Sequence, residues 1–593
     1  MKLPSILRLS ILKKALKDDI SEDKTYFLLT LATGVLSGCV AVFIHSSTRY
    51  MTELFRTNDH FTLETFVLAG LTLFISGIIT TRFFPSTSGS GIPGVRIALA
   101  VFHGTITFGA TLAKLVTSIL ALSTGMSLGR EGPTVAITAG IGSFLGNFFH
   151  ISKKRVKTLV ATGAAGGIAA AFNTPMAAVT FTMEEIVGDL NARMLGSILI
   201  AAVIASITAV ALHGDAPTFA ELNYRLTDYR ELFFYLLIGV VASVCGPLWV
   251  KSVLKLRALN LKIFKGHKLT IIMISFSFMA LLSLYNTDVL GSGHNTIEEA
   301  LLSLILDWKV LLILFCLKFV ATTVCYASGI SGGLFMPTLL MGAMLGGFVG
   351  SVCAIFFPEI TSNTGAYALV GMGAFFVAVI RTPFTSIIMI FEMTRDYNII
   401  LPLMIANLVS YYISGRLHKG SIYESISEQD GIHLPSQDDH ELLDNLHIED
   451  AMNQDVISFN HNRTVSECIE KMIENKTVSG YPVLKMGYLH SMVSTNELNA
   501  RQAKGMGELL VGDVGKCKVI SIYPDQSLLV ALHRLKEYNI SRLPVVSRIN
   551  DRKLLGIITA EDIVNKFGFH IQEEQDEVEE IKVENESGAS TQG

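Results

Sequence analysis

Long apolar runs fill the chain from about Tyr26 to Leu417, and only short clusters of glycine, serine and proline interrupt them. Half of the 593 residues are apolar, and the mean hydropathy is +0.48, which is too apolar for an ordinary soluble enzyme. Runs of this length are those of helices that cross a lipid bilayer. We therefore predict a polytopic α-helical membrane protein.

Composition changes along the chain and divides it into segments. We predict a cytoplasmic N-terminal segment at 1–25, a membrane domain at 26–423, an acidic linker at 424–446, two related soluble units at 447–567 and a disordered acidic tail at 568–593. Basic residues before the first apolar run place the N-terminus in the cytoplasm. The net charge of −4 gives no reason to expect nucleic-acid binding.

The membrane domain contains an internal repeat, with halves at roughly 26–213 and 230–418. Gly-Ser-Gly at 89–91 precedes a Gly/Pro motif at 129–133, and Gly-Ser-Gly at 291–293 precedes another at 333–337 at nearly the same spacing. The segments 162–175 and 370–383 also correspond. Repeated membrane units with helices that stop part-way are typical of transporters, whose ion site lies at the repeat interface.

Acidic residues distinguish the two halves. Glu184 corresponds to Glu392, each nine residues after its proline, which indicates a shared structural task. Glu131 corresponds to Phe335 and Glu185 to Met393, so two acids occur in one half only. Either they serve a function added to a symmetric scaffold, or Glu131 is a local partner of Arg130 and Glu185 a second acid at a cytoplasmic helix end.

The motif Gly129-Arg130-Glu131-Gly132-Pro133 begins a helix inside an apolar region. Its glycines permit close backbone approach, Pro133 suits a first helical turn, and the free N–H groups of that turn attract anions. An ionised Glu131 would compete with an anion for that position.

Three motifs together resemble the CLC family of chloride channels and proton/chloride exchangers: Gly-Ser-Gly-Ile-Pro at Gly89, Gly-Arg-Glu-Gly-Pro at Gly129, and Gly-Gly-Leu-Phe-Met-Pro at 332–337. The resemblance covers nearly all of the membrane domain. It implies inverted-repeat halves, a homodimer with one pathway per subunit, and helix N-termini that converge on an anion.

The resemblance also assigns residues. Ser90 and Tyr423 would donate hydroxyls to a central chloride, while Leu334 and Phe335 would offer backbone N–H groups at its outer side. The motif residues that shape these helix N-termini are Gly89, Gly91, Gly129, Arg130, Gly132, Pro133 and Gly333. Capping for Ser90, interfacial anchoring for Tyr423 and simple packing for Phe335 are the plain alternatives. Serine at position 90 matches chloride-preferring relatives, since nitrate-preferring ones tend to have proline.

Glu131 matches the family's gating glutamate, which occupies an anion position when ionised and leaves it when protonated. Glu185 matches an inner proton-transfer acid that exchangers tend to carry and many channels replace. We therefore expect chloride/proton exchange, with a gated chloride channel as the alternative. No enzymatic activity and no metal site are expected.

The two soluble units resemble a tandem of CBS domains, with amphipathic helices near 464–475 and 527–538. Thr559 and Asp562 match a position that can bind the ribose of ATP, ADP or AMP, although a purely structural tandem is equally compatible. Ser494 and Glu497 occupy that position in the first unit. Membrane metalloproteases also carry such tandems but need a His-Glu-x-x-His helix, which is absent. A CBS-regulated cation transporter would need several acids along its pore.

We place the protein in a bacterial inner membrane with both termini in the cytoplasm, because its loops are short and its N-terminus is compact.

Overall fold

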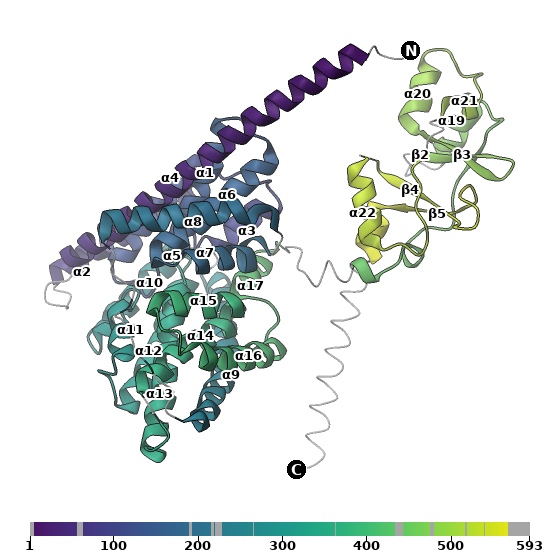
Figure 1. Ribbon diagram of the computed structural model, residues 1–593. Helices are drawn as coiled ribbons and strands as arrows, with labels where there is room; N and C mark the ends of the chain where they lie inside the picture. Colours follow the sequence, from purple (N-terminus) through teal and green to yellow (C-terminus); the bar gives the residue numbers. More distant parts are fainter. Residues whose placement is uncertain are drawn as a thin grey trace, which may run out of the picture. The chain divides into compact units, whose positions relative to one another are not determined.

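The computed structural model describes residues 5–55, 63–188, 192–214, 219, 224, 228–264, 266–361, 363–432, 443–474, 480–515, 519–538 and 540–566. The chain forms two compact units, Met1–Leu434 and Pro435–Gly593 (Figure 1). The predicted acidic tail at 568–593 lies outside the described residues.

The first unit is helical throughout its described part. Its longer helices are α1 (Ser5–Phe55), α2 (Leu63–Ile78), α3 (Ile92–Ala100), α4 (Phe108–Ser123), α5 (Glu131–Phe148), α6 (Lys153–Phe172), α7 (Pro175–Phe181), α8 (Ala192–His213), α9 (Leu232–Ile263), α10 (Lys268–Ser283), α11 (His294–Leu301), α12 (Trp308–Ala327), α13 (Phe335–Phe356), α14 (Thr364–Ile380), α15 (Pro383–Thr394), α16 (Ile400–Leu417) and α17 (Ile422–Gln429).

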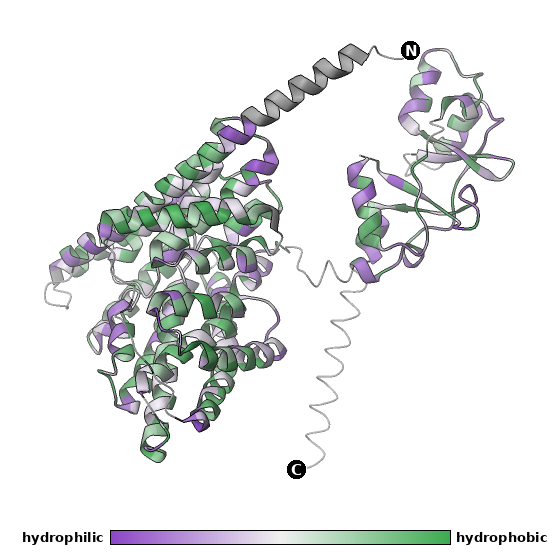
Figure 2. Ribbon diagram, in the orientation of Figure 1, coloured by the Kyte–Doolittle hydropathy of each residue, from purple (hydrophilic) through white to green (hydrophobic). Residues whose placement is uncertain are grey.

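Many of these helices are apolar enough to lie in a bilayer. Seven helical segments of the described chain are long and apolar enough to cross it, and four further apolar helices are shorter: α4, α10, α14 and α15. Hydrophobic residues dominate the helices of this unit, whereas the second unit mixes both kinds (Figure 2). The prediction of a polytopic membrane domain with part-way helices agrees with this arrangement.

The internal repeat is visible in the backbone. Helices α1 to α8 correspond in order to α9 to α16. Gly91 before α3 and Gly293 before α11 both adopt a left-handed conformation, with φ of 89° and 79°. Asn173 and Arg381 end α6 and α14 in that same conformation, with φ of 54° and 65°. The two halves therefore repeat turns as well as helices.

Glu184 and Glu392 show how the halves are related. Glu392, at the end of α15, accepts hydrogen bonds from the N–H groups of Met176 (3.0 Å) and Ala177 (2.7 Å) in the first turn of α7. Glu184, just after α7, accepts from the backbone N–H (2.9 Å) and hydroxyl (2.7 Å) of Thr385 in the first turn of α15. Each carboxylate caps the other half's helix. Equivalent helices are thus antiparallel, as an inverted repeat requires, and the predicted shared task of these acids is confirmed.

Two buried lysines repeat in the same way. Lys114 on α4 donates to the carbonyls of Thr87 (2.8 Å) and Gly89 (2.6 Å). Lys318 on α12 donates to the carbonyls of Val289 (2.9 Å) and Gly291 (2.8 Å). Each ammonium fixes the turn that precedes α3 or α11, which explains how a long cation is tolerated in the membrane domain.

Helix α17 extends to Gln429, into the segment predicted as a linker. Ser421 is its N-cap and forms a capping box with Glu424, in which each side chain accepts from the other residue's backbone N–H. At the other end of the unit, α1 begins at Ser5, so most of the predicted N-terminal segment is continuous with the first membrane helix.

The second unit contains two related α/β motifs. The first has β1 (Phe459–Asn460), α19 (Val465–Glu474), β2 (Gly480–Lys485), β3 (Tyr488–Ser494) and α20 (Thr495–Ala503), with sheet order β1-β2-β3. The second has α21 (Val511–Val514), α22 (Leu528–Glu537), β4 (Arg542–Val546) and β5 (Leu554–Thr559), where β4 and β5 are antiparallel. Both predicted amphipathic helices are present as α19 and α22.

The two motifs exchange their leading segments. Ile448, which precedes the first motif, lies in the core of the second with Ile522 and Leu543. Val511, which precedes the second motif, lies in the core of the first with Val465. The motifs therefore fold as one body.

Candidate functional site

Backbone pairing brings three helix starts together in the first unit. Gly129 and Gly333 exchange two hydrogen bonds, of 2.7 and 2.6 Å. Gly89 pairs with the segment 330–332, directly before Gly333: its N–H donates to the carbonyl of Ile330, and its carbonyl accepts from the N–H of Gly332. The segments before α3, α5 and α13 are thus joined, two from the first half and one from the second, as the repeat predicted.

Glycine is required where these segments cross. A Cβ added at Gly132 would lie 3.0 Å from both Cβ and the carbonyl oxygen of Ser90, and one at Gly333 would lie 3.0 Å from the Gly132 nitrogen. No side chain fits between these backbones. The N-termini of α3, α5 and α13 consequently approach one another more closely than substituted helices could.

The first turns of α5 and α13 keep their N–H groups available. Within the described chain, neither Arg130, the N-cap of α5, nor Leu334, the N-cap of α13, caps its helix with its side chain. Both helices point their positive ends at one place. Uncapped N–H groups at converging helix starts form an anion site.

Glu131 lies at this place. Its side chain is 4% exposed, and its Oε2 atom has no hydrogen-bond partner among the described residues. The carboxylate lies beside the backbone N–H of Met336 in the first turn of α13. An acid therefore sits where an anion would be attracted, as the motif predicted.

Arg130 contacts both this acid and α1. Its Nε atom lies 3.9 Å from Glu131 Oε1, at the limit of an ion pair, while its Nη1 atom contacts His45 Nδ1 on α1. The His45 ring packs edge-on against His213, with centroids 4.7 Å apart. The ion pair with Arg130 and the place of Glu131 at the helix starts are both present, so the two interpretations of Glu131 are compatible.

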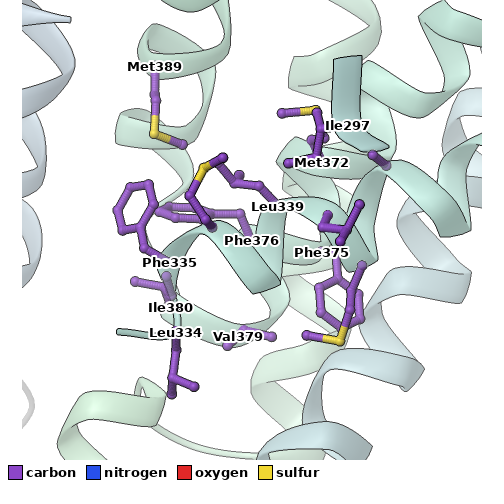
Figure 3. Close-up of a cluster of buried hydrophobic side chains, with 14 of the residues drawn as sticks. Ile297, Leu334, Phe335, Leu339, Met372, Phe375, Phe376, Val379, Ile380 and Met389 are labelled. Carbon is purple, nitrogen blue, oxygen red and sulfur yellow. The ribbon is translucent and has the colours of Figure 1, made fainter. Parts of the chain in front are cut away.

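Phe335 begins α13 inside an aromatic cluster. Its ring centroid lies 4.8 Å from Phe376, 4.9 Å from Phe172 and 5.5 Å from Phe181. Figure 3 shows Phe335 and Phe376 against one another, with Leu334 farther along the same segment. Phe335 thus packs with its side chain and leaves its N–H at the helix start, so the two sequence interpretations are compatible.

Glu185 is buried in a π-helical segment, Thr182–Val187, that directly follows α7. Its Oε1 atom accepts hydrogen bonds from Arg96 Nη1 (2.7 Å) and from the Ser421 hydroxyl (2.8 Å). The equivalent α15 has no such segment at Met393 and is α-helical to Thr394. The residue that breaks the repeat, Glu185, thus lies where the helix geometry also differs between the halves. π-helical segments occur frequently at functional sites.

Ser90 and Tyr423, the two residues predicted to donate hydroxyls to chloride, are both buried. The Ser90 hydroxyl accepts from the N–H of Ile92 at 3.3 Å, but the N-cap of α3 is Gly91, which makes no side-chain cap, so Ser90 does not occupy the capping position that the plain alternative proposed. Tyr423 on α17 is fully buried, and its hydroxyl has no hydrogen-bond partner among the described residues. It lies near Glu131 and Glu185. A buried hydroxyl without a partner is rare and needs a reason.

Thr559 and Asp562 come together in the second unit. Asp562 Oδ2 accepts from the Thr559 backbone N–H (2.8 Å) and hydroxyl (2.7 Å). Ser494 and Glu497 form the same arrangement in the first motif, at 3.0 and 2.9 Å. Both pairs therefore have a capping role, whether or not Asp562 also binds a ribose.

Sequence reasoning missed four residues of the site: Arg96, Lys114, Lys318 and Ser421. The lysines carried a signal, because they occupy corresponding places in the two halves. Ser421 carried another, because serine followed by glutamate three residues later is the pattern of a capping box. Arg96 had no comparable signal, since its partner is 89 residues away.

Antiparallel halves that bring uncapped helix N-termini around a buried acid define an ion-conducting membrane protein built from an inverted repeat. The chain belongs to the voltage-gated chloride channel family, also called CLC, whose model matches residues 72–415. CBS domain models match residues 448–501 and 511–568, which confirms the predicted tandem.

Relatives and solved structures agree with this membership. The H(+)/Cl(-) exchange transporter ClcA of Vibrio cholerae serotype O1 is 31% identical over 442 residues, which cover 71% of this chain and 94% of ClcA. The structure of a slow cyanobacterial Cl−/H+ antiporter matches with a TM-score of 0.64 and 26% identity, over 68% of this chain and 98% of the antiporter. A eukaryotic CLC transporter shares the fold over 91% of this chain and 98% of its own, with a TM-score of 0.63 and 18% identity.

Proposed function

We propose that this protein exchanges chloride for protons across a membrane. The observation that carries the proposal is the pair of buried carboxylates, Glu131 at the converging helix starts and Glu185 in the π-helical segment. Acids inside a membrane domain are costly unless they serve the transported ion or proton. Similarity to proteins named as exchangers supports the same function.

In this proposal Glu131 is the gate. When ionised, its carboxylate holds the anion position at the starts of α5 and α13; when protonated, it no longer competes with chloride. Ser90 and Tyr423 donate hydroxyls to a chloride farther in, and the N–H groups of Leu334 and Phe335 line the outer part. The partnerless hydroxyl of Tyr423 supports its part in this arrangement.

Glu185 separates an exchanger from a channel. A proton acceptor near the inner end of the path serves an exchanger and has no use in a channel, so its presence supports exchange, although some exchangers of the family lack it. The description of the matching family model, a voltage-gated chloride channel, favours the channel as the second candidate. The equivalent Met393 is buried and apolar, so the scaffold accepts an uncharged side chain of similar length there.

The deciding experiment uses the full chain in proteoliposomes. An imposed chloride gradient should drive protons uphill in the unmodified protein. Glu185→Gln should keep chloride flux and lose this proton movement, because an amide cannot relay a proton. Glu392→Gln is the matched control, since that carboxylate caps α7 and should leave coupling intact. No proton movement by the unmodified protein would replace exchange by the channel, whereas proton pumping by Glu185→Gln would remove Glu185 from the proton path.

The remaining proposals concern the setting of this activity. By resemblance to the family we propose a homodimer; because all the proposed transport residues belong to one chain, each subunit would have a complete pathway. We place the protein in a bacterial inner membrane with both termini in the cytoplasm. An adenine nucleotide is a candidate ligand at Thr559 and Asp562, where the carboxylate follows a strand end.

A further inference from the structure

Ser421 connects two parts of the site that the proposed exchange treats separately. Its hydroxyl donates to Glu185 Oε1 at 2.8 Å and accepts from the backbone N–H of Glu424 at 3.2 Å. The first bond reaches the inner acid, and the second caps α17. One hydroxyl thus links the carboxylate to the helix that carries Tyr423.

Arg96 completes the connection from the other side. Its Nη1 atom lies 2.7 Å from Glu185 Oε1 and 3.4 Å from the Ser421 hydroxyl. Arg96 lies on α3, whose first residue, Ile92, donates its N–H to the Ser90 hydroxyl. The single atom Glu185 Oε1 therefore joins α3, which directly follows Ser90, to α17, which carries Tyr423.

The strength of these bonds depends on the charge of Glu185. Hydrogen bonds to an ionised carboxylate are roughly twice as strong as those between neutral groups. A proton on Glu185 removes the charge that attracts Arg96 and weakens the bond from Ser421. The other charged or titratable groups that face Glu185 are Glu184 beside it and Glu424 and Tyr423 on α17. Neither glutamate carries a positive charge, so neither can replace Arg96 as a partner of Glu185.

We propose that Arg96 and Ser421 are positioning residues, which hold α17 and Tyr423 in place while Glu185 is ionised and release them when Glu185 is protonated. This inference rests on the proposed function of Glu185 as the inner proton acceptor. It gives a physical link between proton binding and the chloride path, because α17 moves only when the bonds at Oε1 weaken. Chloride release toward the inside is then faster at acidic internal pH.

The test compares Ser421→Gly with Ser421→Thr in proteoliposomes of the full chain. Glycine is also accepted at N-caps but has no hydroxyl, whereas threonine keeps both the cap and the donor. Ser425→Ala is the matched control, because that buried hydroxyl on α17 bonds His418 and not Glu185. Chloride flux is measured at several internal pH values with the external pH fixed.

The unmodified protein, Ser421→Thr and Ser425→Ala should show faster chloride flux as internal pH falls. Ser421→Gly should be faster at neutral internal pH by roughly 10- to 150-fold, the range that one hydrogen bond to a charged group represents, and its pH profile should be flatter. Arg96→Gln, which leaves the α17 cap intact, should change the profile in the same direction and serves if Ser421→Gly does not fold.

Two results would overturn the inference: a pH profile of Ser421→Gly or Arg96→Gln that matches the unmodified protein, or a flux of the unmodified protein that does not respond to internal pH. Failure of the exchange proposal is recognised separately. In that case the unmodified protein moves chloride without uphill proton transport, while the comparison of pH profiles still decides whether Arg96 and Ser421 hold α17.

Discussion

Removing the hydroxyls of Tyr423 and Ser90 should affect chloride binding alike and stability in opposite directions. The difference follows from their partners. The Tyr423 hydroxyl is buried without a partner among the described residues, whereas the Ser90 hydroxyl accepts from the N–H of Ile92. Tyr423→Phe therefore removes a desolvated polar group, and Ser90→Ala removes the hydrogen bond that the first N–H of α3 makes.

The expected magnitudes are large enough to measure. In chloride-free buffer, Tyr423→Phe should raise the free energy of unfolding by about 1–3 kcal/mol, the cost of a buried polar group without a partner. Ser90→Ala should lower it by about 0.5–1.5 kcal/mol, the usual contribution of one hydrogen bond. Each variant should also lose a hydrogen bond to the anion, about 1.5–3 kcal/mol, which is roughly 10- to 150-fold in the chloride Kd.

Thermal unfolding of purified protein, with chloride replaced by gluconate, measures the first effect, and calorimetric titration with chloride measures the second. Tyr224→Phe is the control, because the Tyr224 hydroxyl donates to the Leu301 carbonyl at 2.7 Å. That variant should lose stability and keep its chloride affinity. A Tyr423→Phe protein that is less stable than the unmodified one and binds chloride as tightly would refute the placement of Tyr423 at the anion site.

Three further outcomes are expected. Glu131→Gln should keep chloride flux in proteoliposomes and abolish chloride-driven proton movement, because the amide imitates the protonated gate; persistent pumping would exclude this role. Glu184→Ala and Glu392→Ala should each lower thermal stability by a similar amount, about 2–6 kcal/mol for two donors left without an acceptor, and markedly unequal losses would contradict the reciprocal caps. ATP or AMP should raise the unfolding temperature of the unmodified protein and not of Asp562→Ala, and an equal rise in both would exclude Asp562 as a ligand.

The sequence predicted the features that repeat or that interrupt a repeat. Corresponding Gly/Pro motifs revealed the two halves, and the acids without a counterpart, Glu131 and Glu185, are the buried ones at the site. The common task of Glu184 and Glu392 could also be predicted from their equal spacing to proline. Patterns of this kind can be recognised because they depend on the spacing of residues along the sequence.

Contacts between distant residues could not be predicted in the same way. The bond from Ser421 to Glu185 joins residues 236 apart, and the bond from Arg96 joins residues 89 apart. No periodicity encodes such a pair, because it depends on how whole helices pack. The sequence also could not predict that Glu184 and Glu392 each cap a helix of the other half. Their equal spacing to proline is compatible with a cap within one half as well as with a cap between the halves.

The reciprocal caps also set an order for biogenesis. Met176 and its acceptor Glu392 are 216 residues apart, so at about 5–20 residues per second the ribosome needs roughly 10–40 s to supply the acceptor. During that interval the first turn of α7 has no carboxylate, and a polar N–H in lipid costs several kcal/mol. The later helix α15, by contrast, finds Glu184 already synthesised. The first half must therefore wait, held by the insertion machinery or by water at the helix start, and the arrival of α15 completes both halves at once.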